Sequence, residues 1–345
     1  MIDIFLKITL AVLLFSLTAC NMDTNSSYYE PYNDNSPHYV IKDEPYFKYA
    51  WHFAYNKKFA QNYNINKNAH IDIEEAWEIT RGAGVVVAVI DSGSFEITHE
   101  DLQRNIIDTY NASYNNKNVS IKYDDPKIDG HGLVVAGLVA SPANGKGLIG
   151  AAPEAKLVLI QVGSSDEATL KAFKYAKNSG AKIISCSWGT RNISPIIESY
   201  LQELKDRGIT IVFASGNDGY NLDYRRGKDI SELPSVIGVG ASNELNRQAT
   251  YTNYGKNIDI LAPGGNTNRS RGVLALFENN SYDYTAGTSI ATPITAGVIA
   301  LMLSVNLSLT PDQIREILIQ SSDEIGRYSI NKINATNAVK LARDY

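Results

Sequence analysis

The sequence predicts an α/β fold, a three-layer, doubly wound and mostly parallel sheet with helices on both faces. Residues 85–90 form a continuous run of valine, alanine and isoleucine, as expected of a strand buried on both faces. Strand-like and helix-like segments then alternate along the chain at a spacing that suits βαβ units. The 345 residues are enough for one large domain of this kind or for two smaller ones.

Five strands and five helices are predicted. The strands are short apolar runs, and the helices have apolar residues spaced three and four apart. Ser194 and Pro195 suit the N-cap and the first position of one helix. The predicted strands are residues 85–90, 156–162, 181–186, 209–214 and 236–239, and the predicted helices are residues 167–178, 194–207, 291–303, 311–320 and 335–342.

Polar residues stand where two of these strands end. In doubly wound sheets the functional site lies at the carboxyl ends of the strands. Asp91 directly follows the first strand, and Asn217 closes the sequence Ala-Ser-Gly-Asn after the strand 209–214. His131 lies between two glycines before an apolar helix start, unlike the other four histidines. Taken singly, Asp91 and Asn217 could be ordinary turn residues, and His131 could be a helix-start or core histidine.

Ser289 lies in the sequence Gly-Thr-Ser-Ile-Ala-Thr-Pro, before the apolar run 294–305 that predicts a buried helix. Alone it could be a helix cap, with Pro293 in the first turn. With Asp91, His131 and Asn217 it completes a set for acyl transfer, in which an aspartate orients a histidine base, the histidine activates the serine, and an amide stabilises the oxyanion. The Gly-x-Ser-x-Gly elbow of α/β-hydrolases does not surround this serine.

The chain resembles the subtilisin-like serine proteases, the subtilase family, from about residue 58 to its end. The resemblance implies a subtilisin-like fold and peptide-bond hydrolysis through an acyl-enzyme, with no cofactor required for catalysis. It implies Asp91 as the orienting acid, His131 as general base and then acid, Ser289 as nucleophile, and the Asn217 amide with the Ser289 N–H as oxyanion hole. The matching segments are residues 87–93, 131–137, 187–189, 214–217, 234–241 and 287–293.

The same resemblance implies how a protein or peptide substrate binds. Residues Ser187, Trp188 and Gly189 would offer their backbone to an extended substrate as an added strand. Ser215 and Gly216 are implied as further substrate-binding residues.

The chain departs from the family pattern at several positions. Leu133 and Val134 replace a threonine and a second histidine, and Ile290 stands where methionine is usual. The connection 163–167 is shorter than in subtilisin, so a more open cleft is expected on that side. Cys186 is expected to be a small buried apolar residue rather than a redox group.

The segment 220–233 matches the one that lines the primary specificity pocket in the family. It carries Arg225, Arg226 and Lys228, with Asp218, Asp223 and Asp229 nearby. A basic pocket floor would favour acidic side chains in the substrate. The alternative is a solvated charged loop, and the sequence leaves both open.

Subtilisins bind calcium through oxygen ligands. Asp101 and Asn144 match two such ligand positions, and Gln61 is a weaker third. The alternative is that these are ordinary solvated loop residues. A structural calcium bound here would stabilise the protein and take no part in catalysis.

The amino end predicts export. Lys7 precedes an apolar run, 8–17, that is too short to span a bilayer but suits a signal peptide. Leu-Thr-Ala-Cys at 17–20 resembles the lipobox of bacterial lipoproteins, which implies a signal peptide 1–19, a lipidated Cys20 and a membrane anchor at the cell surface or envelope. The alternative is an ordinary signal peptide with a chance cysteine.

Residues 20–57 are predicted as an extension before the peptidase domain, 58–345. The part 21–45 is polar and reads as a flexible tether, whereas the tyrosine-rich stretch 46–59 could lie along the domain surface. The extension is too short and polar for the folded pro-domain typical of the family. A role as pro-segment stays open.

The net charge of −5 gives no reason to expect a nucleic-acid partner. The two cysteines, Cys20 and Cys186, cannot form a disulfide framework, and a monomer is expected. The sequence therefore predicts an exported, lipid-anchored serine endopeptidase. Two alternatives stay open: a catalytically silent module that binds peptides, and an esterase or other acyl hydrolase.

Overall fold

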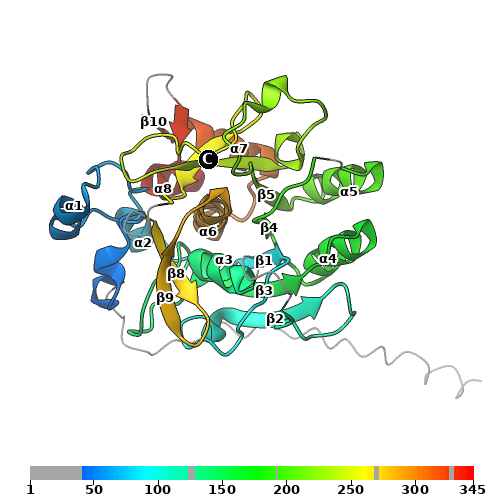
Figure 1. Ribbon diagram of the computed structural model, residues 1–345, viewed down its shortest axis with the longest axis horizontal. Coiled ribbons are helices and arrows are strands. Elements are labelled where there is room, and N and C mark those ends of the chain that lie inside the picture. The colour runs from blue at the N-terminus through cyan, green and yellow to red at the C-terminus, as the bar shows by residue number, and fades with distance from the viewer. Residues whose placement is uncertain (1–40, 123–128, 192, 268–271, 326–329) are drawn as a thin grey trace, which may run out of the picture. The chain divides into compact units, whose positions relative to one another are not determined.

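The computed structural model describes residues 41–122, 129–191, 193–267, 272–325 and 330–345, which all lie in one compact unit, Tyr39–Tyr345. The predicted signal peptide 1–19, Cys20 and the extension up to residue 40 lie outside the described residues. Figure 1 shows the helices and strands of the described part.

A nine-stranded sheet runs through the described part in the order β10-β11-β7-β6-β5-β4-β1-β3-β2. All neighbouring strands are parallel except β10 and β11. The predicted doubly wound, mostly parallel α/β fold is confirmed. The strands are β1 (Val86–Asp91), β2 (Ile106–Asn111), β3 (Lys156–Gln161), β4 (Ile183–Cys186), β5 (Thr210–Ala214), β6 (Ile237–Ser242), β7 (Ile260–Pro263), β10 (Asp323–Ile325) and β11 (Ile330–Lys332).

Helices cover both faces of this sheet, as predicted (Figure 1). The central strand β1 is buried on both sides because its alternate residues enter two different hydrophobic clusters, Val87 and Val89 in one, Ala88 and Ile90 in the other. The first cluster includes α3 and α6, the second α4 and α5. The helices are α1 (Lys57–Tyr63), α2 (Glu74–Ile79), α3 (His131–Ala140), α4 (Asp166–Asn178), α5 (Pro195–Asp206), α6 (Thr288–Val305), α7 (Pro311–Gln320) and α8 (Ala335–Asp344).

Of two expectations about helix starts, one is confirmed and one was wrong. Ser194 is the N-cap residue of α5 and Pro195 is its first residue, although the Ser194 side chain makes no capping hydrogen bond. Helix α6 begins at Thr288, so Ser289 lies inside its first turn and Pro293 lies in the helix interior. Although α6 is long and apolar enough to cross a membrane, most of it is buried inside the protein, where it packs against strands β4 to β7.

A second, two-stranded sheet was missing from the sequence prediction. Strands β8 (Val273–Phe277) and β9 (Ser281–Thr285) form an antiparallel hairpin whose second strand leads into α6. The hairpin packs on α3, and its turn contains Asn279 and Asn280 with positive φ. It thereby connects the start of α6 with the helix that carries His131.

Residues 41–57 belong to the same core as the rest of the described domain. Trp51 and Phe53 are buried, and the Trp51 indole donates a hydrogen bond to the Gly272 carbonyl at the start of the hairpin (2.7 Å). Phe53 stacks edge-on against Trp77 of α2. The tyrosine-rich stretch thus packs through aromatic contacts and short 3₁₀ turns, Ile41–Asp43 and Phe47–Tyr49, and the domain boundary placed at residue 58 stays a prediction of the sequence alone.

A buried lysine holds the end of the sheet. Lys332 of β11 has a fully buried side chain, and its Nζ donates to the carbonyls of Asn68 and His70 and to Asn246 Oδ1. The ammonium group therefore acts as an internal cation that joins two loops, one before α2 and one after β6, to the end of the sheet.

Candidate active site

Asp91 and His131 form a hydrogen-bonded pair at the carboxyl end of β1. Asp91 is the last residue of β1, and His131 is the first residue of α3. His131 Nδ1 lies 2.9 Å from Asp91 Oδ2 and 3.0 Å from Oδ1, while Oδ1 also accepts the Gly93 N–H at 2.8 Å. The carboxylate is 1% exposed and the imidazole 26%, so the far side of the ring is open to a reacting partner.

The electrostatics of this pair favour a charged imidazole. Burial of His131, the largest single influence, lowers its pKa, but the charge of Asp91 and the hydrogen bond that its carboxylate accepts from the imidazole act in the opposite direction. The net effect is that the pKa of His131 lies above its usual value. A histidine held in this way can accept a proton and keep it while a reaction intermediate exists.

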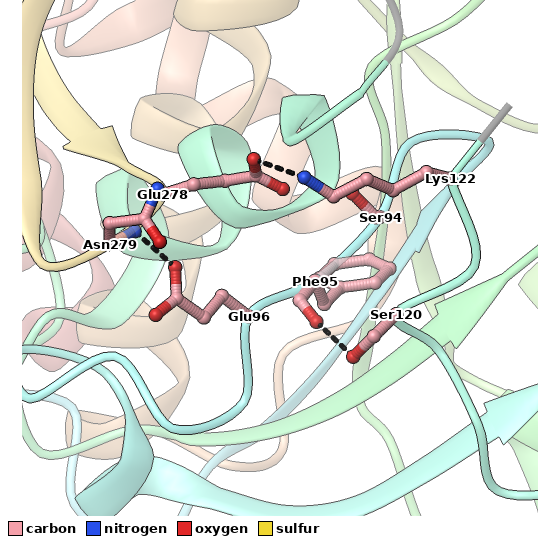
Figure 2. Close-up of a pocket in the computed structure, with 7 residues that line it drawn as sticks. All are labelled: Ser94, Phe95, Glu96, Ser120, Lys122, Glu278 and Asn279. Carbon is pink, nitrogen blue, oxygen red and sulfur yellow. Dashed lines mark hydrogen bonds and ion pairs between the residues drawn. The ribbon is translucent and has the colours of Figure 1, made fainter. Parts of the chain in front are cut away.

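Residues from three segments lie near the start of α3: Ser94 after β1, Lys122 before α3, and Glu278 in the β8–β9 turn. Figure 2 shows them lining a pocket of about 200 Å³. The Ser94 hydroxyl accepts the N–H of Gly130, whose φ of +73° favours glycine. Lys122 and Glu278, from the loop before α3 and the tip of the β8–β9 hairpin, form an ion pair over this site. A Cβ on Gly132 would lie only 2.9 Å from the Gly93 carbonyl, so glycine lets α3 approach the end of β1.

Ser289 lies at the same edge of the sheet. In a helix, the N–H of residue 293 would bind the carbonyl of residue 289, but Pro293 has no N–H. The Ser187 hydroxyl donates to that free Ser289 carbonyl instead (2.9 Å). The proline therefore leaves an acceptor that fixes the serine backbone to the segment after β4, the neighbour of β1 in the sheet.

Asn217 faces the Ser289 hydroxyl across Gly287. Its Oδ1 accepts both the N–H and the hydroxyl of Thr288, at 2.8 and 3.0 Å, which leaves its amide Nδ2 to donate elsewhere. A Cβ built on Gly287 would lie 3.0 Å from Ser289 Oγ and 3.5 Å from Asn217 Nδ2. Hydroxyl and amide thus converge on one small space that any larger residue at 287 would fill.

The loop that carries Asn217 depends on Asn253, which the sequence analysis missed. Asn253 Oδ1 accepts the N–H groups of Asp218 and Tyr220, and its Nδ2 donates to the Ser215 carbonyl. Gly216 donates to the Thr288 hydroxyl. The backbone of Ser215 and Gly216 thus takes part in hydrogen bonds that hold this loop. Their role in binding substrate stays a prediction.

The predicted substrate segment follows β4 without regular secondary structure. Trp188 is anchored by its indole, which donates to the Ile90 carbonyl (2.9 Å) and stacks edge-on against Phe213. Gly189 is exposed. A pocket of about 390 Å³ is lined by Trp188, Gly189 and the short connection with Gly163 and Ser164.

The charged loop 220–233 is mostly solvated. Arg226 and Lys228 are exposed, and the Arg225 guanidinium stacks 4.0 Å above the Tyr220 ring. Asp218 pairs with Arg191, a residue outside the predicted pocket segment. The structure thus favours the solvated loop over a basic pocket floor.

The predicted calcium residues converge, but with a different third member. Asp101 and Asn144 lie beside Glu44, whereas Gln61 is exposed on α1. Glu44 Oε1 accepts the Gly145 N–H and Asp101 Oδ2 accepts the Leu148 N–H, while the second oxygen of each carboxylate is buried and has no hydrogen-bond partner among the described residues. Burial, with the nearby Glu44 charge, raises the pKa of Asp101 to about 8.

The family-pattern departures fit the core. Leu133, Val134 and Ile290 are buried apolar residues of α3 and α6. Cys186 is buried beside Ile90 in the sheet, and burial, with the Asp91 charge nearby, raises the pKa of its thiol well above the usual value. The expectation of an inert apolar cysteine is consistent with that environment.

The subtilase family matches residues 82–340. The chain belongs to this family. The thermophilic serine proteinase of Bacillus sp. (strain AK1) is 31% identical over 305 residues, which are 85% of this chain and 70% of that protein. A calcium-dependent protease of Trichormus variabilis is 30% identical over 335 residues, 80% of this subtilase but only 49% of the relative.

A solved protease structure from Pseudoalteromonas arctica PAMC 21717 superposes with a TM-score of 0.76 at 26% identity, covering 88% of this chain and all of that one. The domain of this subtilase is thus that of a serine-type endopeptidase, a hydrolase. Four supporting residues could not be predicted from the sequence. Ser94, Asn253 and Glu278 support the segments of the active site, and Glu44 lies beside the predicted calcium residues. They carried no motif, because each acts through contacts with residues far away in sequence.

Proposed function

We propose that this subtilase cleaves peptide bonds through an acyl-enzyme formed on Ser289. The observation that supports the proposal is that the Asp91–His131 pair, the Ser289 backbone anchored by Ser187, and the Asn217 amide lie at the same edge of the sheet. His131 takes the Ser289 proton as Oγ attacks the carbonyl carbon. The C–N bond then breaks as His131 passes that proton to the leaving amine. Water next attacks the ester while His131 takes its proton, and His131 returns a proton to Ser289 as the ester bond breaks.

Asn217 Nδ2 and the Ser289 N–H would hold the oxyanion that forms at each step. Asn217 is preorganised for this role because Thr288 occupies its other side-chain atom. Donors fixed in advance stabilise developing charge without reorganisation.

A fluorophosphonate probe tests the nucleophile directly. We expect the wild-type protein to be labelled on Ser289 and Ser289→Ala to remain unlabelled, with peptide mapping as the measurement. His131→Ala should label far more slowly because the base is lost. A folded wild-type protein that takes no label would contradict the enzyme proposal and favour the silent peptide-binding module. Cleavage of ester but not peptide substrates would favour the acyl-hydrolase alternative.

We further propose a structural calcium held by Glu44, Asp101 and Asn144. Two buried carboxylate oxygens that have no partner within the described part of the chain, next to an amide, match the oxygen ligands that calcium prefers. Among the described residues no group of three histidine, cysteine, aspartate or glutamate side chains could hold a metal, so backbone carbonyls would have to complete this set. The similarity to a calcium-dependent protease supports the assignment.

Calcium is expected to stabilise the folded protein without entering the reaction. At a concentration 100 times its dissociation constant it should add about 2.7 kcal/mol to the free energy of unfolding, and raise Tm by about 4 °C over a sample with chelator. Asp101→Asn keeps an acceptor for Leu148 but should abolish this rise in differential scanning calorimetry. Glu100→Gln is the matched control, since the Glu100 side chain is exposed and pairs with Lys146. An equal rise in Asp101→Asn would contradict the site.

We also propose export and lipid anchoring through Cys20, on the sequence of the amino end alone. Mass spectrometry of the mature amino terminus would show a diacylglyceryl group on Cys20 if this is correct. A free or absent cysteine would contradict it. The extension 20–57, the peptidase boundary at 58 and the monomeric state are proposals of the same kind, and residues 41–57 of that extension pack in the core of the domain.

A further inference from the structure

A carboxylate lies directly behind the exposed glycine of the substrate segment. A Cβ built on Gly189 would lie 3.8 Å from both Oδ1 and Oδ2 of Asp229 and 3.7 Å from the Ala214 carbonyl oxygen. Because residue 189 has no side chain, nothing on it separates the Asp229 carboxylate from the space beside this segment. Two kinds of acceptor, a carboxylate and a carbonyl, border the same space.

Asp229 is held rigidly by one oxygen. It is the N-cap of the 3₁₀ turn Ile230–Glu232, and its Oδ1 accepts the N–H and the hydroxyl of Ser231 at 3.0 and 2.8 Å. Glu232 closes the capping box by accepting the Asp229 N–H. Within the described ranges no donor bonds Asp229 Oδ2, so this oxygen can accept from a bound side chain.

The charges around Asp229 leave the space negative. Burial raises the pKa of Asp229, the nearby Glu232 carboxylate adds to that rise, and the charge of Arg191 acts in the opposite direction. Arg191 is half exposed and bonded to Asp218, so its charge is already shared. Arg225 stacks on Tyr220 instead. The basic residues of the loop therefore do not neutralise the two carboxylates.

We propose that Asp229 makes this subtilase prefer lysine or arginine as the substrate residue before the cut. A basic side chain passing Gly189 would meet Asp229 Oδ2 and the Ala214 carbonyl, whereas an acidic one would meet two like charges. This inference rests on the proposed peptidase function and reverses the sequence-based hypothesis of a basic pocket floor. It adds substrate selection to that function and leaves the reaction steps unchanged.

The experiment compares peptidyl phosphonates that differ only in the side chain at this position: lysine, arginine, leucine or glutamate. They react with the serine itself, so the second-order rate of inactivation reports pocket preference without requiring turnover. We expect lysine and arginine to react at least 10-fold faster than leucine, and glutamate slowest. The preference for the basic probes should fall as salt is raised. Equal rates, or faster reaction with leucine, would overturn the proposal.

Asp229→Asn should remove this preference. Asparagine keeps an oxygen acceptor for Ser231, and we expect the lysine-to-leucine rate ratio to fall by 10-fold or more with the leucine rate nearly unchanged. Asp223→Asn, in the same loop but exposed, is the matched control and should keep the wild-type ratio. An unchanged ratio in folded Asp229→Asn would contradict the role of Asp229.

The wild-type comparison stands even if the Asp229→Asn variant fails to fold. Failure of a simple fluorophosphonate to label Ser289 would instead reject the proposed peptidase function. The two failures are therefore distinguishable.

Discussion

Asp91→Asn is expected to lower kcat by about 10⁴-fold, the loss that follows when the orienting aspartate of such a triad is made an amide. Asparagine can still accept the Gly93 N–H, so the end of β1 should keep its shape. Its NH₂ group would face His131 Nδ1 and force the proton to the opposite nitrogen. That nitrogen could then no longer accept the Ser289 proton.

The same substitution should also shift the pH dependence. In the wild type the net effect of Asp91 is to raise the pKa of His131, so the acidic limb of kcat/KM should lie above the ordinary histidine value. Without the aspartate charge, burial alone would lower that pKa, and the limb should move to lower pH. Steady-state kinetics over a range of pH measures it, with Asp206→Asn, an exposed carboxylate of α5, as control. An acidic limb at the same pH in the wild type and in Asp91→Asn would show that Asp91 does not set the pKa of His131.

Asn217→Ala is expected to lower kcat by about 10²–10³-fold with little change in KM, the magnitude known from removing this kind of donor in subtilisin. The reason is that the Asn217 amide is needed only while negative charge develops on the substrate oxygen. The rate of acylation in a burst experiment measures the effect.

Asn217→Asp separates the donor from the scaffold. Aspartate can still accept from the N–H and hydroxyl of Thr288, so the turn before Ser289 should be preserved, but it cannot donate to an oxyanion. We expect a loss at least as large as in the alanine variant, together with a normal melting temperature. Near-wild-type acylation in either variant would rule out Asn217 as the oxyanion donor.

The sequence was sufficient for five of the nine strands of the main sheet, β1 and β3 to β6, because apolar runs leave a local signal. It did not predict β2, β7, β10, β11 or the β8–β9 hairpin. A β-branched run marks β1, and Asp91 and His131 lie next to such elements. The position of Pro293 could not be predicted in the same way. Its local preference is for a first helical turn, but a hydroxyl from Ser187, about 100 residues away, satisfies the carbonyl that the proline leaves free.

Glu44 and Asp229 were misjudged for another reason. The composition around Glu44 is typical of a tether, and the aromatic residues after it follow no helical or strand period because they pack through 3₁₀ turns and ring edges. In the loop 220–233 the basic residues dominate the composition. Only the three-dimensional arrangement shows that Arg226 and Lys228 point to solvent while a carboxylate backs Gly189.

The packed segment 41–57 limits how the amino end can be processed. A cut after Glu44 would detach one carboxylate from the Asp101 site, and a cut after Trp51 would also release the Gly272 carbonyl at the start of the hairpin that leads to Ser289. Maturation that preserves both contacts therefore has to stop before Glu44. The packing of the folded domain, and not only the sequence that a processing protease recognises, limits how far into the chain such a cut can lie.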